Sequence, residues 1–271
     1  MTDVKAKKQE LCSKNEYGFE DLVAVMEILR SEEGCPWDRE QDHESIRNDF
    51  IEETYEVIEA IDTKDPILLR EELGDVMLQV VFHSRIEEEK GSFGIKEVCN
   101  DICKKLVHRH PHVFGEIKVS YSGEVLDVWN NIKNEEKQRI TMTDKLRAIP
   151  PMLPALMRAE KVGKKAKCFD FSDAKSVRVK VDEELREVDE AVACGNSEAI
   201  EEEIGDLLLT VTSLCRKLGV HPEEALKKAT DKFIDRFETL ECETQKRGID
   251  INTATMETLD AVWDEIKHKK I

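Results

Sequence analysis

Residues 51–56 read Ile-Glu-Glu-Thr-Tyr-Glu, and residues 71–75 read Glu-Glu-Leu-Gly-Asp. The same acidic pattern returns as Asp-Glu-Glu-Leu-Arg-Glu at 182–187 and as Glu-Glu-Ile-Gly-Asp at 202–206. A single offset of 131 residues carries 51 to 182 and 71 to 202 without a gap. Each half later repeats a Val-Trp-x-x-Ile-Lys unit, at 128–133 and 262–267. Because the features keep one order, the chain is a tandem duplication.

The segments around these stretches have helical periodicity. Apolar side chains recur every three or four residues, as in Ile51, Tyr55 and Ile58 of the first half. Asp65-Pro66 and Asn196-Ser197 interrupt the pattern and supply N-cap chemistry for the next helix. No alternating, β-branched run stands out as a strand. We therefore expect an all-α fold built from two duplicated modules of four or five helices each.

A proline-rich segment separates the two halves. Residues 148–154 read Ala-Ile-Pro-Pro-Met-Leu-Pro, and no helix continues through three prolines so closely spaced. We place the first module at residues 1–145 and the second at 146–271.

Composition narrows the possible partners. The 271 residues carry 59 Asp and Glu against 41 Lys and Arg, a formal net charge of −18. Such a surface repels nucleic acids and anionic membranes but suits divalent cations, and through them a small polyanion. The N-terminus lacks the apolar core of a signal peptide, and no apolar run approaches about 18 residues. We expect a cytoplasmic protein without nucleic-acid or membrane partners.

The eight cysteines form no C-x-x-C pair and have no secretory context for disulfides. Cys99 and Cys103 lie one turn apart in a helical pattern, where a buried free thiol is the ordinary expectation.

The repeated acidic residues are candidate metal ligands. Residues three and four apart share a helix face, so each module can gather four carboxylates if its paired helices pack antiparallel. These are Glu53, Glu56, Glu72 and Asp75 in the first module and Glu184, Glu187, Glu203 and Asp206 in the second. Two like charges about 4 Å apart repel by roughly 4 kcal/mol at an effective dielectric near 20, so the clusters need cations. Oxygen-only ligands favour Mg²⁺, with Mn²⁺ as an alternative.

A solvated acidic helix face is the alternative interpretation of each cluster. The identical spacing of the two copies favours a site. Gly74 and Gly205 also favour a site. Glycine inside a helix destabilises it by about 1 kcal/mol relative to alanine, and a residue without a side chain fits the close approach of another helix or a ligand.

The two modules differ in their candidate phosphate-binding cations. Around the second cluster these candidates are Lys180, Lys232, Arg236 and Lys267, with Trp263 beside them. In the first module Asp49 replaces Lys180, Arg109 lies opposite Lys232 but Val113 opposite Arg236, while Trp129 and Lys133 remain. The second module is therefore the better equipped to hold a triphosphate.

The chain resembles the MazG family of nucleoside triphosphate pyrophosphohydrolases in its two-domain form. The resemblance covers roughly residues 19 to 271. The stretches that carry it are Gly34–Gln41 (Gly-Cys-Pro-Trp-Asp-Arg-Glu-Gln), Glu52–Asp75, Arg109–Gly115 (Arg-His-Pro-His-Val-Phe-Gly) and Glu183–Asp206.

The resemblance implies Mg²⁺-dependent hydrolysis of (d)NTP between the α- and β-phosphates, giving (d)NMP and pyrophosphate, and a role in cleaning the nucleotide pool. It implies a homodimer in which helices of two subunits complete each site. It also implies Mg²⁺ at Glu184, Glu187, Glu203 and Asp206, and by analogy at the four acids of the first module. Nucleotide contacts are implied for Lys180, Lys232, Arg236, Trp263 and Lys267. Glu183 is assigned to positioning or deprotonating water.

The chain departs from the family pattern at a few positions. His108 stands where the family usually has Arg, Asp42 replaces Thr, Thr230 replaces Asn, and Cys168–Phe171 (Cys-Phe-Asp-Phe) replaces Gly-Phe-Asp-Trp. None of these changes removes a proposed metal ligand, but base preference stays open, since Trp37, Trp129 or Trp263 could stack on any base. The string His108–His112 suggests a transition-metal site, but Pro111 disrupts the helical spacing.

Two rival functions remain. A di-iron or di-manganese bundle needs Glu-x-x-His on two helices, and the chain offers Glu40-x-x-His43 and Glu265-x-x-His268, both outside the acidic blocks. A non-catalytic scaffold that kept a metal-binding relic would bind Mg²⁺ without turnover.

Overall fold

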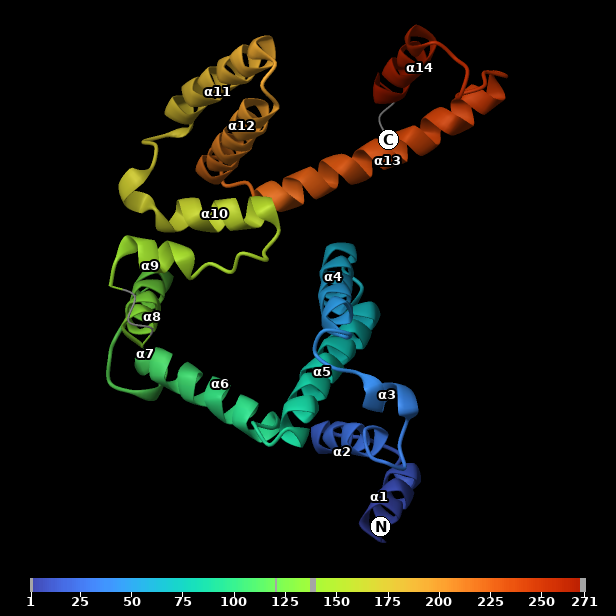
Figure 1. Ribbon diagram of the computed structural model, residues 1–271, viewed down its shortest axis with the longest axis vertical. Helices are drawn as coiled ribbons and strands as arrows, with labels where there is room; N and C mark the ends of the chain where they lie inside the picture. Colours follow the sequence, from blue (N-terminus) through green and yellow to red (C-terminus); the bar gives the residue numbers. More distant parts are fainter. Residues whose placement is uncertain (1, 120, 137–139, 269–271) are drawn as a thin grey trace. The chain divides into compact units, whose positions relative to one another are not determined.

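The computed structural model describes residues 2–119, 121–136 and 140–268, and the regular secondary structure of these residues is entirely helical (Figure 1). This confirms the all-α prediction. None of the described helices is long and apolar enough to cross a membrane.

The chain divides into two compact units, residues 1–132 and 133–271. The helices that begin in the first unit are α1 Thr2–Ser13, α2 Phe19–Leu29, α3 Pro36–Glu40, α4 Arg47–Thr63, α5 Pro66–Glu89, α6 Ile95–Arg109, α7 Pro111–Phe114 and α8 Ser122–Glu136. The second unit continues with α9 Met142–Arg147, α10 Ala155–Lys165, a 3₁₀ turn η1 at Lys167–Phe169, α11 Ala174–Cys194, α12 Ser197–Lys217, α13 Pro222–Lys246 and α14 Met256–His268. The prolines at 150, 151 and 154 lie between α9 and α10, as expected of helix breakers. The module boundary at 145/146 stays a prediction.

Each unit contains one long helical hairpin, α4–α5 in the first and α11–α12 in the second (Figure 1). The turns are built alike. The Asp65 carboxylate accepts hydrogen bonds from the backbone amides of Ile67 and Leu68, and Asn196 caps α12 in the same way. Gly195 adopts the left-handed conformation that ends α11, with φ 66°. Lys64 adopts it at φ 57° without that freedom, at a cost of roughly 1–2 kcal/mol.

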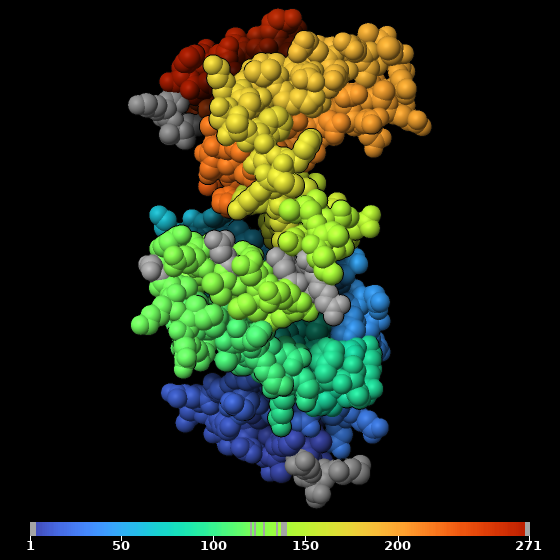
Figure 2. Space-filling view, turned by 90° about the vertical axis from the view of Figure 1, so that its left-hand side faces the viewer, coloured from blue at the N-terminus to red at the C-terminus, as the bar shows by residue number. Residues whose placement is uncertain are grey.

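The core of the first unit packs α2 against the second half of α5. Met26, Val81, Phe82 and Ile86 are buried there together with Ile46, which precedes α4. Figure 2 shows the dark-blue α1–α2 segment next to the blue-green α5 and α6 of the same unit. This packing fixes one end of the α4–α5 hairpin and leaves the cluster-bearing end projecting.

In the second unit α10 packs on α12 and α13, and a small core between α13 and α14 buries Leu240, Val262 and Ile266. Asp170, just after η1, binds both guanidinium nitrogens of Arg216, at 2.7 and 2.5 Å, and the Lys217 ammonium at 2.8 Å. Arg216 foremost, with Lys217, holds the pKa of the Asp170 carboxyl well below its usual range. The segment before α11 is therefore tied to the end of α12.

The expectation of buried thiols was wrong for the helical pair. Cys99 and Cys103 are both exposed on α6 in this chain, and Cys35 and Cys215 are the half-buried ones. α6 makes few contacts beyond its neighbours α5 and α7, so its helical periodicity did not imply burial within the unit. None of the eight cysteines forms a disulfide.

Candidate metal and nucleotide site

The first carboxylate cluster lies on the facing sides of α4 and α5. Glu53, Glu56 and Glu72 each offer an oxygen, and these oxygens all lie within 4.8 Å of one another. Glu72 is buried and the other two are half-buried. In the part of the chain that the structure describes, none of the three forms an ion pair with a Lys or Arg. The cluster thus gathers acidic groups without a compensating protein cation.

Burial and the crowding of these acids raise the pKa of two of them. Burial, followed by the charge of Asp75 and by Glu56, raises the pKa of Glu53 to about 7. Burial and the neighbouring Glu56 also raise the pKa of Glu72. A raised carboxyl pKa means that the ionised form lacks stabilisation, which a divalent cation would supply.

The second cluster has the same frame on α11 and α12. Glu184, Glu187 and Glu203 bring their oxygens within 4.8 Å of one another. Here, however, Lys180 lies one turn earlier on α11, and its ammonium is 3.0 Å from Glu184 and 3.8 Å from Glu187. Glu184 is only 4% exposed. A buried carboxylate at this position is therefore already paired with a cation.

Lys180 also binds Glu183, at 2.8 Å. This bond, with the one to Glu184, raises the pKa of Lys180, and the lysine in turn lowers the pKa of Glu183. For Glu187 burial outweighs the lysine, so its pKa is raised. Lys180 stays protonated and Glu183 ionised at neutral pH, beside the three clustered acids.

The remaining predicted ligands are placed differently. Asp75 is half-buried and close enough to Glu53 to raise its pKa, yet it is outside the group of three. Asp206 is exposed and likewise outside its group. The glycines beside them have open surroundings, since a Cβ built on Gly74 or Gly205 meets nothing within 4 Å. Close approach of another helix of the same chain is therefore not what requires glycine there.

The other predicted nucleotide contacts of the second module lie on α13 and α14. Lys232 and Arg236 occupy one stretch of α13, and the Trp263 ring packs 5.3 Å from the ring of Phe233. Lys267 is paired with Asp264 at 3.0 Å. Among the described residues no hydrogen bond or ion pair joins these side chains to the second cluster, and Lys180 alone of the predicted cations reaches it.

In the first unit Arg109 is buried, with its guanidinium 5.3 Å from the centre of the Trp129 ring. His110 packs edge-on against the same ring and its Nδ1 lies 2.6 Å from the carbonyl oxygen of Leu106. These contacts fix the turn between α6 and α7. Lys133 lies on α8.

One residue pair was missed by the sequence analysis. The Thr210 hydroxyl on α12 donates a hydrogen bond to Glu184 at 3.4 Å. The repeat offset puts Gln79 at the matching place on α5, and its side-chain oxygen has no partner among the described residues. Both positions are buried polar residues within a helical apolar face, and this signal was available from the repeat.

The structure gives little support to a histidine-containing metal site. His43 has its Nδ1 2.8 Å from Nδ1 of His83 and its Nε2 2.7 Å from Glu87, so its neighbours lie on α5 and not beside Glu40. Glu265 is paired with Arg247 at 2.6 Å. The groups of three potential ligands found in residues 2–119, 121–136 and 140–268 consist of carboxylates alone.

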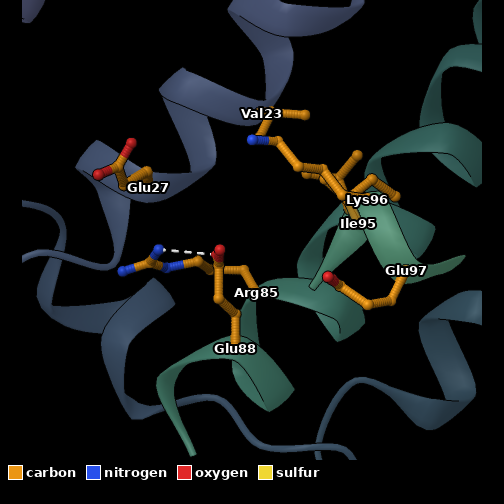
Figure 3. Close-up of a pocket in the computed structure, with 8 residues that line it drawn as sticks. Val23, Glu27, Arg85, Glu88, Ile95, Lys96 and Glu97 are labelled. Atoms are coloured by element: carbon orange, nitrogen blue, oxygen red, sulfur yellow. Dashed lines mark hydrogen bonds and ion pairs between the residues drawn. The ribbon is translucent and has the colours of Figure 1, made fainter. Parts of the chain in front are cut away.

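A cavity of about 300 Å³ between α2, α5 and α6 is a poor phosphate site (Figure 3). Its Arg85 is already paired with Glu88 and Glu89, and Glu27 and Glu97 add negative charge. Arg85 also lies 13 residues after Glu72 on α5, which is about 20 Å along the helix. The cavity is therefore remote from the first cluster.

The carboxylate clusters fit a hard divalent cation. Three oxygen donors converge in each, sulfur and imidazole are absent from both groups, and the raised pKa values of Glu53, Glu72 and Glu187 mark uncompensated negative charge.

Comparison with known proteins agrees with this chemistry. The MazG nucleotide pyrophosphohydrolase domain matches the chain twice, at residues 41–114 and 172–240. A Thermotoga maritima protein named nucleoside triphosphate pyrophosphohydrolase/pyrophosphatase MazG is 44% identical over 92% of this chain and 95% of its own length. The nucleoside triphosphate pyrophosphohydrolase of Escherichia coli K12 is 41% identical over 92% of this chain and 97% of its own. Each acidic cluster lies inside one of the two matched segments.

Proposed function

This chain belongs to the MazG nucleotide pyrophosphohydrolase family, and from that premise we propose that its second acidic cluster is the principal site of hydrolysis. The chain is a nucleoside triphosphate pyrophosphohydrolase. It converts a (d)NTP to the (d)NMP and pyrophosphate. The observation that carries the assignment to the second cluster is Lys180, which contacts three acidic side chains there, whereas the matching position in the first unit is Asp49.

We assign Mg²⁺, with Mn²⁺ as a substitute, to Glu184, Glu187 and Glu203, with Asp206 completing the set when substrate is present. The first cluster would hold the same ion through Glu53, Glu56, Glu72 and Asp75. When bound, the ion supplies positive charge to the triphosphate and makes water a better nucleophile.

The protein's own groups then have distinct tasks. Glu184 is fixed from one side by Lys180 and from the other by Thr210, so its carboxylate is oriented before any ligand arrives. Glu183 is ionised and solvent-accessible at the edge of the cluster, which suits it to orient or deprotonate the attacking water. Lys180 is close enough to exchange a carboxylate for a phosphate oxygen and so hold negative charge during cleavage.

We further propose that the enzyme is a homodimer whose partner completes each site. Lys232 and Arg236 lie on α13 among exposed apolar residues, namely Leu226, Phe233, Ile234 and Phe237. Exposed apolar surface of this kind marks an interaction face. A second copy packing on α13 would cover these side chains and bring cations, with Trp263 and Lys267, to a cluster that has Lys180 alone. Light scattering of the purified chain tests this, since a monomer at micromolar concentration would contradict it.

The free thiols and the net charge of −18 support the further proposals of a reducing, cytoplasmic location and of no nucleic-acid partner.

The reaction is tested by incubating the purified chain with NTPs and dNTPs plus Mg²⁺ and identifying the products. Monophosphate with pyrophosphate is the expected result. Diphosphate with orthophosphate would overturn the position of cleavage, and Mg²⁺ binding without turnover would instead favour the scaffold alternative.

A further inference from the structure

A small cavity in the first unit lies next to the first cluster and has no role so far. Its volume is about 130 Å³, and Met26, Ile46 and Phe82 form its apolar floor. Trp37 on α3 and Gln79 on α5 also line it. An apolar cavity of about 150 Å³ accommodates one benzene-sized ring, so this one suits a single six-membered aromatic ring.

Gln79 gives the cavity an unused hydrogen-bonding group. Its side chain is 8% exposed, and its Oε1 is buried without a hydrogen-bond partner in the described part of the chain. A buried polar atom left in this state destabilises the fold, because it has lost its hydrogen bond to water without gaining another. The matching Thr210 of the second unit donates to Glu184, whereas the Gln79 oxygen can only accept a hydrogen bond and has no donor beside it in the described residues. A ligand that donates to Gln79 would remove the penalty.

The cavity lies one to two helical turns from the carboxylates. Asp49 lines it on α4, four residues before Glu53. Gln79 lines it on α5, seven residues after Glu72. Four to seven residues advance about 6–10 Å along a helix, which is a separation that the sugar and α-phosphate of a nucleotide can span. A nucleotide with its phosphates at the first cluster can therefore reach the cavity with its base.

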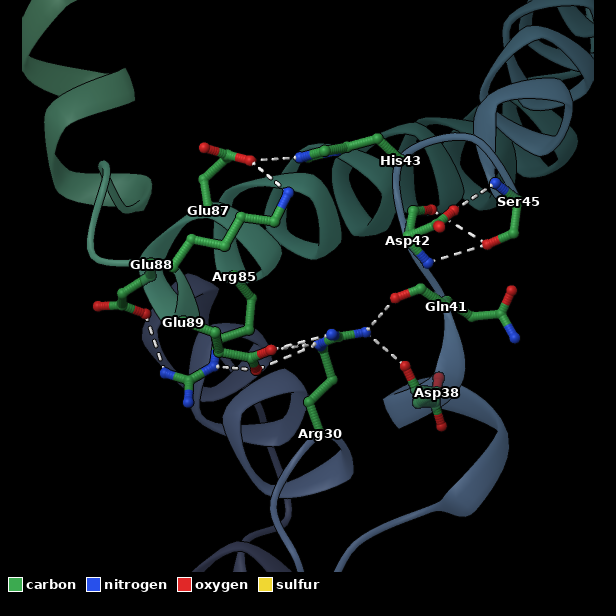
Figure 4. A network of polar contacts seen from close by, with 11 residues as sticks. Arg30, Asp38, Gln41, Asp42, His43, Ser45, Arg85, Glu87, Glu88 and Glu89 are labelled. Atoms are coloured by element: carbon green, nitrogen blue, oxygen red, sulfur yellow. Dashed lines mark hydrogen bonds and ion pairs between the residues drawn. The ribbon is translucent and has the colours of Figure 1, made fainter.

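The wall that carries Trp37 is held in place before any ligand arrives. Arg30, almost fully buried, donates to the backbone carbonyls of Asp38 and Gln41 at 2.5 and 3.0 Å and pairs with Glu89 at 2.9 Å (Figure 4). Trp37 itself remains 59% exposed. Its ring is thus presented on a fixed turn with a face open for stacking.

The polar groups at the cavity select for a hydrogen-bond donor. Asp38 and Asp49 line it with Gln79, and ionised carboxylates only accept hydrogen bonds. They repel phosphate, which excludes the triphosphate itself from this space. The matching chemistry is an exocyclic amino group, because it donates two hydrogen bonds to these acceptors whereas a ring N–H donates one.

We propose that this cavity, with Trp37 and Gln79, binds the base of an amino-bearing pyrimidine nucleotide, that is, cytosine, whose phosphates lie at Glu53, Glu56 and Glu72. The inference rests on the proposed metal and phosphate role of the first cluster. It makes the first unit a selective nucleotide site whose specificity the second unit, with Thr210 at the matching position, does not share.

The test uses the full chain carrying E184Q and E187Q, which removes the second metal site. Binding of α,β-methylene dCTP, the corresponding dUTP and dATP analogues, and inorganic tripolyphosphate is measured by calorimetry with Mg²⁺. We expect the dCTP analogue to bind about 10-fold more tightly than the other two. Adding Q79L should weaken its binding about 10-fold while leaving tripolyphosphate binding unchanged, because tripolyphosphate has no base.

Two further variants keep the result interpretable. Q79T introduces the residue of the second unit and should lose the preference for cytosine. W37A alters an exposed ring that can stack on any base, so it should weaken binding of all three nucleotide analogues and leave tripolyphosphate binding unchanged. Equal affinity for all three nucleotides, or an equal loss of tripolyphosphate binding in Q79L, would overturn the base pocket. Absence of tripolyphosphate binding before any change at Gln79 would instead overturn the phosphate role of the first cluster on which the pocket depends.

Discussion

The two acidic clusters of this chain have nearly the same carboxylates, but only the second has a lysine paired with them among the described residues. In the first unit Glu53, Glu56 and Glu72 converge without a lysine or arginine partner in the described residues, and the pKa of Glu53 is raised to about 7. In the second unit Lys180 contacts Glu184 and Glu187. The duplicated units kept the same arrangement of carboxylates. They differ at one matching position, which is Asp49 in the first unit and Lys180 in the second, and only the lysine can pair with the carboxylates.

This difference separates metal binding from substrate binding. Carboxylates that converge on one point can bind a cation in either unit, because the geometry alone supplies the ligands. Protein cations aimed at the same point strengthen the binding of a triphosphate beyond what a metal ion supplies. The first unit has converging carboxylates and a candidate base cavity, and the second unit has converging carboxylates together with Lys180.

The largest effect is expected from E184Q. Loss of this buried, doubly anchored ligand should lower turnover of the whole chain by roughly 100-fold or more, since even outer-shell partners of a metal site are worth 10–100-fold. Steady-state release of pyrophosphate from a good substrate measures it. E53Q changes the matching residue of the first unit and should leave turnover nearly unchanged; the opposite pattern would assign the reaction to the first unit.

A smaller effect is expected from K180M, which removes the cation but keeps the side-chain length. A hydrogen bond to a charged group is worth about 1.5–3 kcal/mol, so KM should rise by roughly 10- to 100-fold, with a smaller change in kcat. Initial rates over a range of substrate concentrations measure both constants. D49M is the matched control in the first unit, and an equal rise in KM there would show that Lys180 has no special role.

The clusters should also differ in the pH dependence of stability without metal. The folded-state pKa of Glu53 is above its ordinary value of 4.5, so the native state binds more protons than the unfolded state between about pH 4.5 and 7. Stability of the metal-free first unit should therefore fall as pH rises through this range. Thermal unfolding in EDTA measures it.

Mg²⁺ should oppose this loss, and most strongly near pH 7, where Glu53 must ionise to bind the ion. E53Q should flatten the pH dependence. If E53Q keeps the wild-type slope, the raised pKa belongs to another group of the cluster.

The smallest effect is expected from T210V, which preserves shape but removes the hydroxyl that donates to Glu184. A net hydrogen bond is worth about 0.5–1.5 kcal/mol, so turnover should fall roughly 2- to 10-fold. T212V is the control, because that buried hydroxyl donates to the Leu208 carbonyl of its own helix and not to Glu184. Equal losses in the two variants would indicate a general effect on α12.

Much of the fold was accessible from the sequence because its signals are local. Helical periodicity, the caps Asp65 and Asn196 and the three prolines depend on residues close together in the chain, and each predicted feature appears at its expected place. Burial within a helix was less predictable. Cys99 and Cys103 fit the helical pattern but are exposed, because burial depends on what packs against α6.

By itself the sequence determined that the chain is duplicated and all-helical, and that each half carries a repeated set of acids on adjacent helices. Repetition and helical spacing are properties of residue order. The tertiary structure was needed to show that three of each four acids meet within 4.8 Å, that Lys180 pairs with acids of one cluster, and that the Gln79 side-chain oxygen lacks a partner in the described residues beside the other. Those outcomes depend on distances between helices and on burial, which set the strength of a charge interaction and the cost of an unsatisfied polar atom.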